Sequence, residues 1–123
     1  MAVTGPDFIA LQVRDLERAA EFYETRLGLR RVQAAPPGAV LFATSPIPFA
    51  VREPLPGVDL DQATPRPGTG VALWLHCDDS QELHDSLAAA GTTILRAPEA
   101  GPFGLAFTFL DPDGYAVTVH DKA

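Results

Sequence analysis

The stretch FIALQVRDLERAAEFYETRLGL, residues 8–29, decides the fold because it holds a complete strand-and-helix unit. Residues 7–13 are apolar and alternating and follow a Gly-Pro pair, which predicts a strand. Asp15 is a typical helix N-cap, and apolar side chains then recur at helical spacing as far as Leu27. Gly28 is an expected C-terminal glycine. A strand followed by a helix therefore opens the chain.

The same unit returns after 64 residues, in GVALWLHCDDSQELHDSLAAAG, residues 70–91. There we expect a strand over 71–77 and a helix that is capped by Asp79 or Ser80 and closed by Gly91. Three short strands are predicted after each helix, over 30–35, 39–44 and 48–53, and over 92–96, 105–110 and 115–120. The sequence thus predicts two βαβββ modules in tandem, an α+β fold.

The length of 123 residues fits one domain. We expect module one at about 5–53, a linker at 54–69 and module two at about 70–121. The linker contains four prolines and two glycines, which is typical of a connecting or covering loop.

Charge and composition exclude several classes of function. Nine basic against 16 acidic residues give a net charge of −7, so nucleic acid and membrane surfaces are not expected partners. No apolar run is long enough to span a bilayer, and the first residues do not resemble a signal peptide. The single cysteine, Cys77, excludes an internal disulfide. A cytoplasmic location is therefore expected.

Residues 8–29 and 70–91, together with the closing FTFLDPDGYAVTV at 107–119, resemble the vicinal oxygen chelate superfamily. That family includes glyoxalase I, extradiol dioxygenases, fosfomycin-resistance transferases, and bleomycin- and mitomycin-binding resistance proteins. The resemblance covers nearly the whole chain and implies the glyoxalase/bleomycin resistance fold, in which the strands form a curved, cup-like mixed sheet. It does not specify a function, because the fold hosts both enzymes and binding proteins.

The resemblance also indicates where a metal ion would be held. Metal-dependent members carry up to four His or Glu ligands that face the cup. The matching positions in this sequence are Phe8, Arg52, Ala72 and Thr118. These side chains do not make a metal site of that kind. We therefore expect no metal, no catalytic residue of the family's kind and no cofactor.

Alternation along the strands places aromatic, small and polar side chains on the cup face, as in a small-molecule pocket. Trp74 offers a flat surface for stacking planar or cationic ligands, although it would equally suit a closed core or a dimer interface. The expected ligand-binding residues are Phe8, Gln12, Arg52, Trp74, His76 and Thr118. His76 and His120 remain open between a general base, a metal ligand and an ordinary hydrogen-bonded histidine.

The sequence therefore predicts a metal-free binding protein that sequesters a small organic, antibiotic-like molecule in resistance or self-protection. The acidic surface favours a cationic ligand, and Trp74 an aromatic one. The resemblance implies a homodimer. The alternative is an enzyme of the same superfamily, either with nonstandard metal ligands such as His76, His120 and Glu53 or with metal-free acid–base chemistry. A regulatory domain with a vestigial cavity is a third possibility, and whether the protein is an enzyme stays open.

Overall fold

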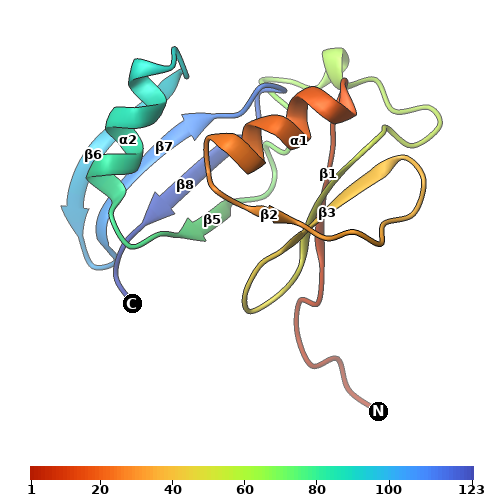
Figure 1. The fold of residues 1–123 in the computed structure, drawn as a ribbon, viewed down its shortest axis with the longest axis horizontal. Coiled ribbons are helices and arrows are strands. Elements are labelled where there is room, and N and C mark those ends of the chain that lie inside the picture. The colour runs from red at the N-terminus through yellow and green to blue at the C-terminus, as the bar shows by residue number, and fades with distance from the viewer. The chain divides into compact units, whose positions relative to one another are not determined.

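The computed structural model describes residues 1–123 and contains two compact units, residues 1–59 and residues 60–123 (Figure 1). Each unit has its own four-stranded sheet. The helices are too short and too polar to span a bilayer.

The first unit is one βαβββ module. Its sheet has the order β1-β4-β3-β2, with β1 parallel to β4 and the other pairs antiparallel. Its elements are β1 (Ile9–Gln12), α1 (Leu16–Thr25), β2 (Arg30–Arg31), β3 (Ala39–Ala43) and β4 (Phe49–Arg52). Tyr23 of α1 packs against the rings of Phe42 and Phe49, at centroid distances of 6.3 and 5.0 Å, so the core lies between α1 and the sheet.

The second unit repeats this arrangement with the order β5-β8-β7-β6. Its elements are the 3₁₀ helix η1 (Leu60–Gln62), β5 (Leu73–His76), α2 (Ser80–Ala89), β6 (Ile94–Gly101), β7 (Gly104–Leu110) and β8 (Ala116–His120). β5 runs parallel to β8, and the remaining pairs are antiparallel. The two units confirm the predicted α+β fold of tandem βαβββ modules.

The helix caps follow from the sequence. Asp15 accepts a hydrogen bond from the backbone N of Arg18 at 3.1 Å. Asp79, rather than Ser80, caps α2 by accepting from the backbone N of Glu82 at 3.0 Å. The side-chain oxygen thus satisfies an N–H group that has no partner within the helix.

Two strands, β2 and β6, differ most from the predicted bounds. β2 contains only Arg30 and Arg31, whereas residues 30–35 were expected. β6 continues to Gly101, five residues beyond the expected end at Arg96. Its pairing with β7 is irregular at two places, which removes the alternation on which strand prediction depends. The linker was expected to be irregular, and it contains η1.

Candidate functional site

The sheet of the second unit has one buried face, which we call the helix face. Phe107, Phe109, Val117 and Val119 point to it and are at most 1% exposed. α2 packs on this face, where the His84 ring lies 5.4 Å from the Phe107 ring. Residues that alternate with these four must point to the opposite face, which we call the open face.

Two rows of directly paired residues cross the open face. In the first row, Trp74 pairs with Thr118, Thr118 with Thr108, and Thr108 with Arg96. The second row runs from His76 through His120 and Ala106 to Glu99. Directly paired residues project to the same side of a sheet, so the first row brings four chemically different side chains onto one surface.

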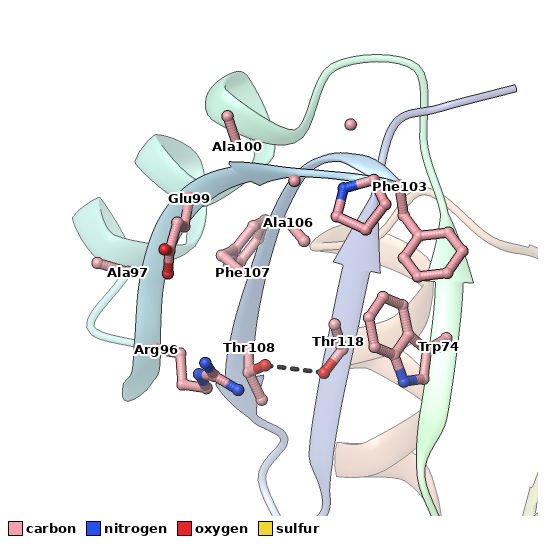
Figure 2. A pocket seen from close by; sticks show the side chains of 13 residues that line it. Trp74, Arg96, Ala97, Glu99, Ala100, Phe103, Ala106, Phe107, Thr108 and Thr118 are labelled. Carbon is pink, nitrogen blue, oxygen red and sulfur yellow. Dashed lines mark hydrogen bonds between the residues drawn. The ribbon is translucent and has the colours of Figure 1, made fainter.

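A pocket of about 280 Å³ lies on this surface, and its lining includes the whole first row. Figure 2 shows Trp74 and Phe103 at one side of the pocket, and Arg96 and Glu99 on the strand at the other side. Pockets for small ligands typically start at roughly 300 Å³. This pocket therefore suits a small compound or one part of a larger compound.

The aromatic side of the pocket is formed by Trp74 and Phe103. Their ring centroids lie 5.5 Å apart with an interplanar angle of 68°, an edge-to-face arrangement. Trp74 is 47% exposed and Phe103 54% exposed. Both rings therefore keep apolar surface open to a ligand.

Thr108 and Thr118 lie between the aromatic and the charged side chains. Their hydroxyl oxygens are 2.7 Å apart, which is hydrogen-bond distance. The resemblance assigns Thr118 to a metal-ligand position, and the structure has a neutral hydroxyl pair there. The pair can offer one remaining O–H donor and free lone pairs to a ligand.

His76 and His120 are neighbours in the second row, with ring centroids 5.5 Å apart. The His120 ring also lies 5.9 Å from the Trp74 ring and 6.2 Å from the Phe103 ring. Its Nδ1 atom is buried and has no hydrogen-bond partner. His76 is exposed, and neither histidine belongs to the pocket lining.

The remaining predicted site residues belong to the first unit. Gln12 and Arg52 are directly paired on β1 and β4, so they share a face. Gln12 Oε1 accepts a hydrogen bond from the backbone N of Leu55 at 2.8 Å, and Arg52 Nε donates to the backbone oxygen of Glu53 at 2.9 Å. Phe8 precedes β1 and is 49% exposed. The six predicted residues thus form one set of three in each unit.

Sequence reasoning missed Phe103, Arg96 and Glu99. Phe103 lies in the two-residue turn between Gly101 and Gly104, which pair as the last rung of β6 and β7. The sequence predicts a strand that ends at Arg96, which leaves Glu99 in the following loop. A continuous strand through Pro98 would have revealed both, but a proline argues against a strand interior.

The residues that the resemblance assigns to metal-ligand positions do not fit a metal ion. Phe8 and Ala72 have no donor atoms, Arg52 is a cation, and the Thr118 hydroxyl already bonds Thr108. No group of three or more His, Cys, Asp or Glu side chains is placed to hold a metal ion. Structural and catalytic metal sites need at least three converging donors of these types.

A family model described as the Glyoxalase/Bleomycin resistance protein/Dioxygenase superfamily matches residues 5–119. The chain belongs to this superfamily. The match covers both modules and confirms the resemblance of the three sequence segments. A comparison with curated proteins finds no significant match.

Solved structures that are similar to this chain include both a binding protein and an enzyme. The antibiotic-binding protein TnmS3 from Streptomyces sp. CB03234 is 23% identical, with a TM-score of 0.75, over 100% of this chain and 99% of that one. Lactoylglutathione lyase from Agrobacterium tumefaciens is 23% identical, with a TM-score of 0.68, over 98% of this chain and 95% of that one. The fosfomycin resistance protein FosX from Mesorhizobium loti is 19% identical, with a TM-score of 0.68, over 99% of this chain and 95% of that one. At these identities the similarity shows the fold alone.

Proposed function

We propose that this superfamily member binds a small organic molecule with a planar part in the second-module pocket and sequesters it without a metal ion. The observation that carries the proposal is the pair of exposed aromatic rings, Trp74 and Phe103, beside the Thr108–Thr118 hydroxyls in a pocket of about 280 Å³. A few polar groups among apolar walls are the usual composition of a ligand site.

The character of the ligand follows from the aromatic side. A tryptophan face attracts flat rings by stacking and cations through its quadrupole. The net charge of −7 adds a long-range attraction for cations. An antibiotic-like compound with a planar or cationic part fits both features, and an antibiotic-binding protein is among the similar structures. We therefore place resistance or self-protection first among the biological roles.

In the first module, Phe8, Gln12 and Arg52 are proposed as ligand-binding residues on the sheet of that module itself. Arg52 is the only one of the three with a charge, so it would pair with an anionic group of the ligand. Gln12 already accepts a hydrogen bond from the backbone N of Leu55, which fixes its position on this sheet.

The emission of Trp74 tests the proposal directly, because it is the only tryptophan in the chain. The protein is titrated with bleomycin, mitomycin C and a planar cationic dye such as proflavine. We expect at least one of them to change the emission saturably. Calorimetry of Trp74→Ala should then show about tenfold weaker binding, equivalent to ~1.4 kcal/mol of lost stacking and buried area. Val32→Ala, an exposed apolar change outside the pocket, serves as the control.

Two results would contradict the proposal. One is that no planar compound in the panel changes the Trp74 emission. The other is that Trp74→Ala binds the active compound as tightly as the wild type does. Loss of binding in Val32→Ala as well would indicate a general effect of substitution rather than a contact at Trp74.

Metal-free acid–base catalysis by His76 or His120 is the second candidate. It is favoured by one observation, the His120 Nδ1 atom that lacks a hydrogen-bond partner beside the Trp74 ring. Proton transfer would also require the bound compound to reach this buried nitrogen, which lies outside the pocket lining. Turnover of a bound compound that follows a histidine-like pH profile, and that disappears in His120→Gln, would favour the enzyme over the binding protein.

A further inference from the structure

Strand β6 is bulged at two places, and the bulges determine which of its side chains reach the pocket. Ile94 pairs with Phe109, which points to the helix face, whereas Arg96 pairs with Thr108 on the open face. Residues two apart in a regular strand share a face. An extra residue between Ile94 and Arg96 therefore turns the Arg96 side chain to the open face.

The second bulge does the same for Glu99. Arg96 and Glu99 are three residues apart, so a regular strand would place them on opposite faces. Their partners on β7, Thr108 and Ala106, are only two residues apart, and the register shifts between them. One extra residue on β6 therefore brings Glu99 to the same face as Arg96. Figure 2 shows both side chains at the strand opposite Trp74.

Arg96 and Glu99 both line the pocket. Neither side chain forms an ion pair or hydrogen bond within the chain, although other charged residues do. The two residues belong to neighbouring rows, so the guanidinium and the carboxylate can approach one ligand group from two sides. Two bulges thus present two opposite unpaired charges at the end of the pocket away from the aromatic rings.

We propose that Arg96 and Glu99 determine specificity for ligands whose flat ring carries a zwitterionic end group, with a carboxylate for Arg96 and an ammonium for Glu99. This inference rests on the pocket of the proposed function and specifies its ligand class. An arginine fork matches a carboxylate in geometry, and Glu99 accepts N–H donors from an ammonium. Three strand spacings of roughly 4.8 Å separate the edge strands β5 and β6, so these strands lie about 14 Å apart. A ligand whose end group contacts Arg96 and Glu99 therefore extends its ring over Thr108 and Thr118 towards Trp74.

A matched set of four probes tests the inference: L-phenylalanine, 2-phenylethylamine, 3-phenylpropionate and 3-phenylpropanol. All four share a phenyl ring. In the order given, they carry both charges, only the positive charge, only the negative charge, and no charge. Affinity is measured from Trp74 emission or from amide chemical shifts in the NMR spectrum. We expect L-phenylalanine to bind tightest, with about a two- to fivefold loss for each missing charge, as for solvent-exposed ion pairs.

Two variants assign each charge to its residue. Arg96→Gln should weaken L-phenylalanine and 3-phenylpropionate and leave the amine and the alcohol unchanged. Glu99→Gln should weaken L-phenylalanine and 2-phenylethylamine and leave the other two unchanged. Arg30→Gln and Glu21→Gln, exposed charges in the first unit, are the matched controls and should change nothing. High salt should reduce the advantage of the charged probes but not the binding of the alcohol.

The outcomes separate this inference from the function on which it rests. If all four probes bind equally, or if each variant weakens all four alike, the pocket binds aromatic rings and the assignment to Arg96 and Glu99 is wrong. If none of the four probes changes the Trp74 signal or the pocket amides while proflavine does, the assignment to Arg96 and Glu99 is wrong and the proposed function stands. If proflavine and the antibiotics give no change either, both proposals fail.

Discussion

The hydroxyl oxygens of Thr108 and Thr118 lie 2.7 Å apart, at paired positions on β7 and β8. Thr108 is only 7% exposed, so its hydroxyl relies on Thr118 for a hydrogen bond. At the position that the resemblance assigns to a metal ligand, this chain thus has two neutral hydroxyls that bond to each other. The pair ties the middle strands of the sheet together under the pocket.

Thr118→Val should lower the free energy of unfolding by about 1–3 kcal/mol, because it leaves the buried Thr108 hydroxyl without its partner. Thr108→Val should lower the free energy of unfolding by less, since the hydroxyl that it leaves unpaired, that of Thr118, is less buried. Urea unfolding of both single variants and the double variant measures the coupling. The double variant should lose less than the sum of the two single losses. Simple additivity would contradict a hydrogen bond between the two side chains.

Gly104→Ala should destabilise the second unit by more than about 1 kcal/mol. Gly104 has a φ of +83°, and an added Cβ would lie 2.8 Å from the backbone N of Lys122. The left-handed backbone alone costs an alanine roughly 1–2 kcal/mol. Gly101→Ala is the matched control across the same rung, because a Cβ there meets open space. Equal unfolding midpoints for the two variants would contradict this account.

Asp79→Ala should lower the free energy of unfolding by about 1 kcal/mol, as expected for a lost N-cap. The Asp79 side chain accepts from the backbone N of Glu82 at 3.0 Å at the start of α2. The neighbouring Asp78→Ala removes the same charge without removing a cap, and it should have little effect. Thermal unfolding of both variants makes the comparison, and a larger loss for Asp78→Ala would refute the capping role of Asp79.

Arg31→Gln should raise the pKa of Glu17 towards that of an ordinary glutamate. In the wild type the hydrogen bond from Arg31, at 2.7 Å, and the charge of its guanidinium lower this pKa. Ionised Glu17 therefore stabilises the folded protein at any pH above the pKa of a glutamate in the unfolded chain. This stabilisation is lost as the pH falls through the lower pKa that Glu17 has in the folded protein. Carboxyl NMR titration reports the shift, with Arg30→Gln as control. An unchanged Glu17 titration in Arg31→Gln would show that the pair does not persist in solution.

Added Zn²⁺, Mn²⁺, Fe²⁺ or Ni²⁺ should not raise the melting temperature, because the positions that the resemblance assigns to metal ligands hold Phe8, Arg52, Ala72 and Thr118. A ligand that binds only the folded state would raise it. Elemental analysis of untagged protein, before and after dialysis, accompanies the melting curves. Close to one tightly held ion per chain would reverse the expectation and direct attention to His76 and His120.

The repeating unit and the helix caps could be predicted from the sequence because they depend on local signals. Alternation also assigned Trp74 and Thr118 to one face, and their direct pairing agrees with that assignment. The bulges of β6 could not be predicted, because an extra residue breaks the alternation from which a face is read. For that reason Arg96 and Glu99, one end of the pocket, were not among the predicted site residues.

Strand β6 is also an edge of its sheet, where unpaired backbone groups can recruit a strand from another molecule. Bulges, a proline and outward charges are the usual protection against such edge-to-edge aggregation, and β6 contains all three, with Pro98 between Arg96 and Glu99. Solubility and ligand choice therefore depend on the same short segment. A change that straightened β6 to alter specificity would at the same time expose the sheet to aggregation.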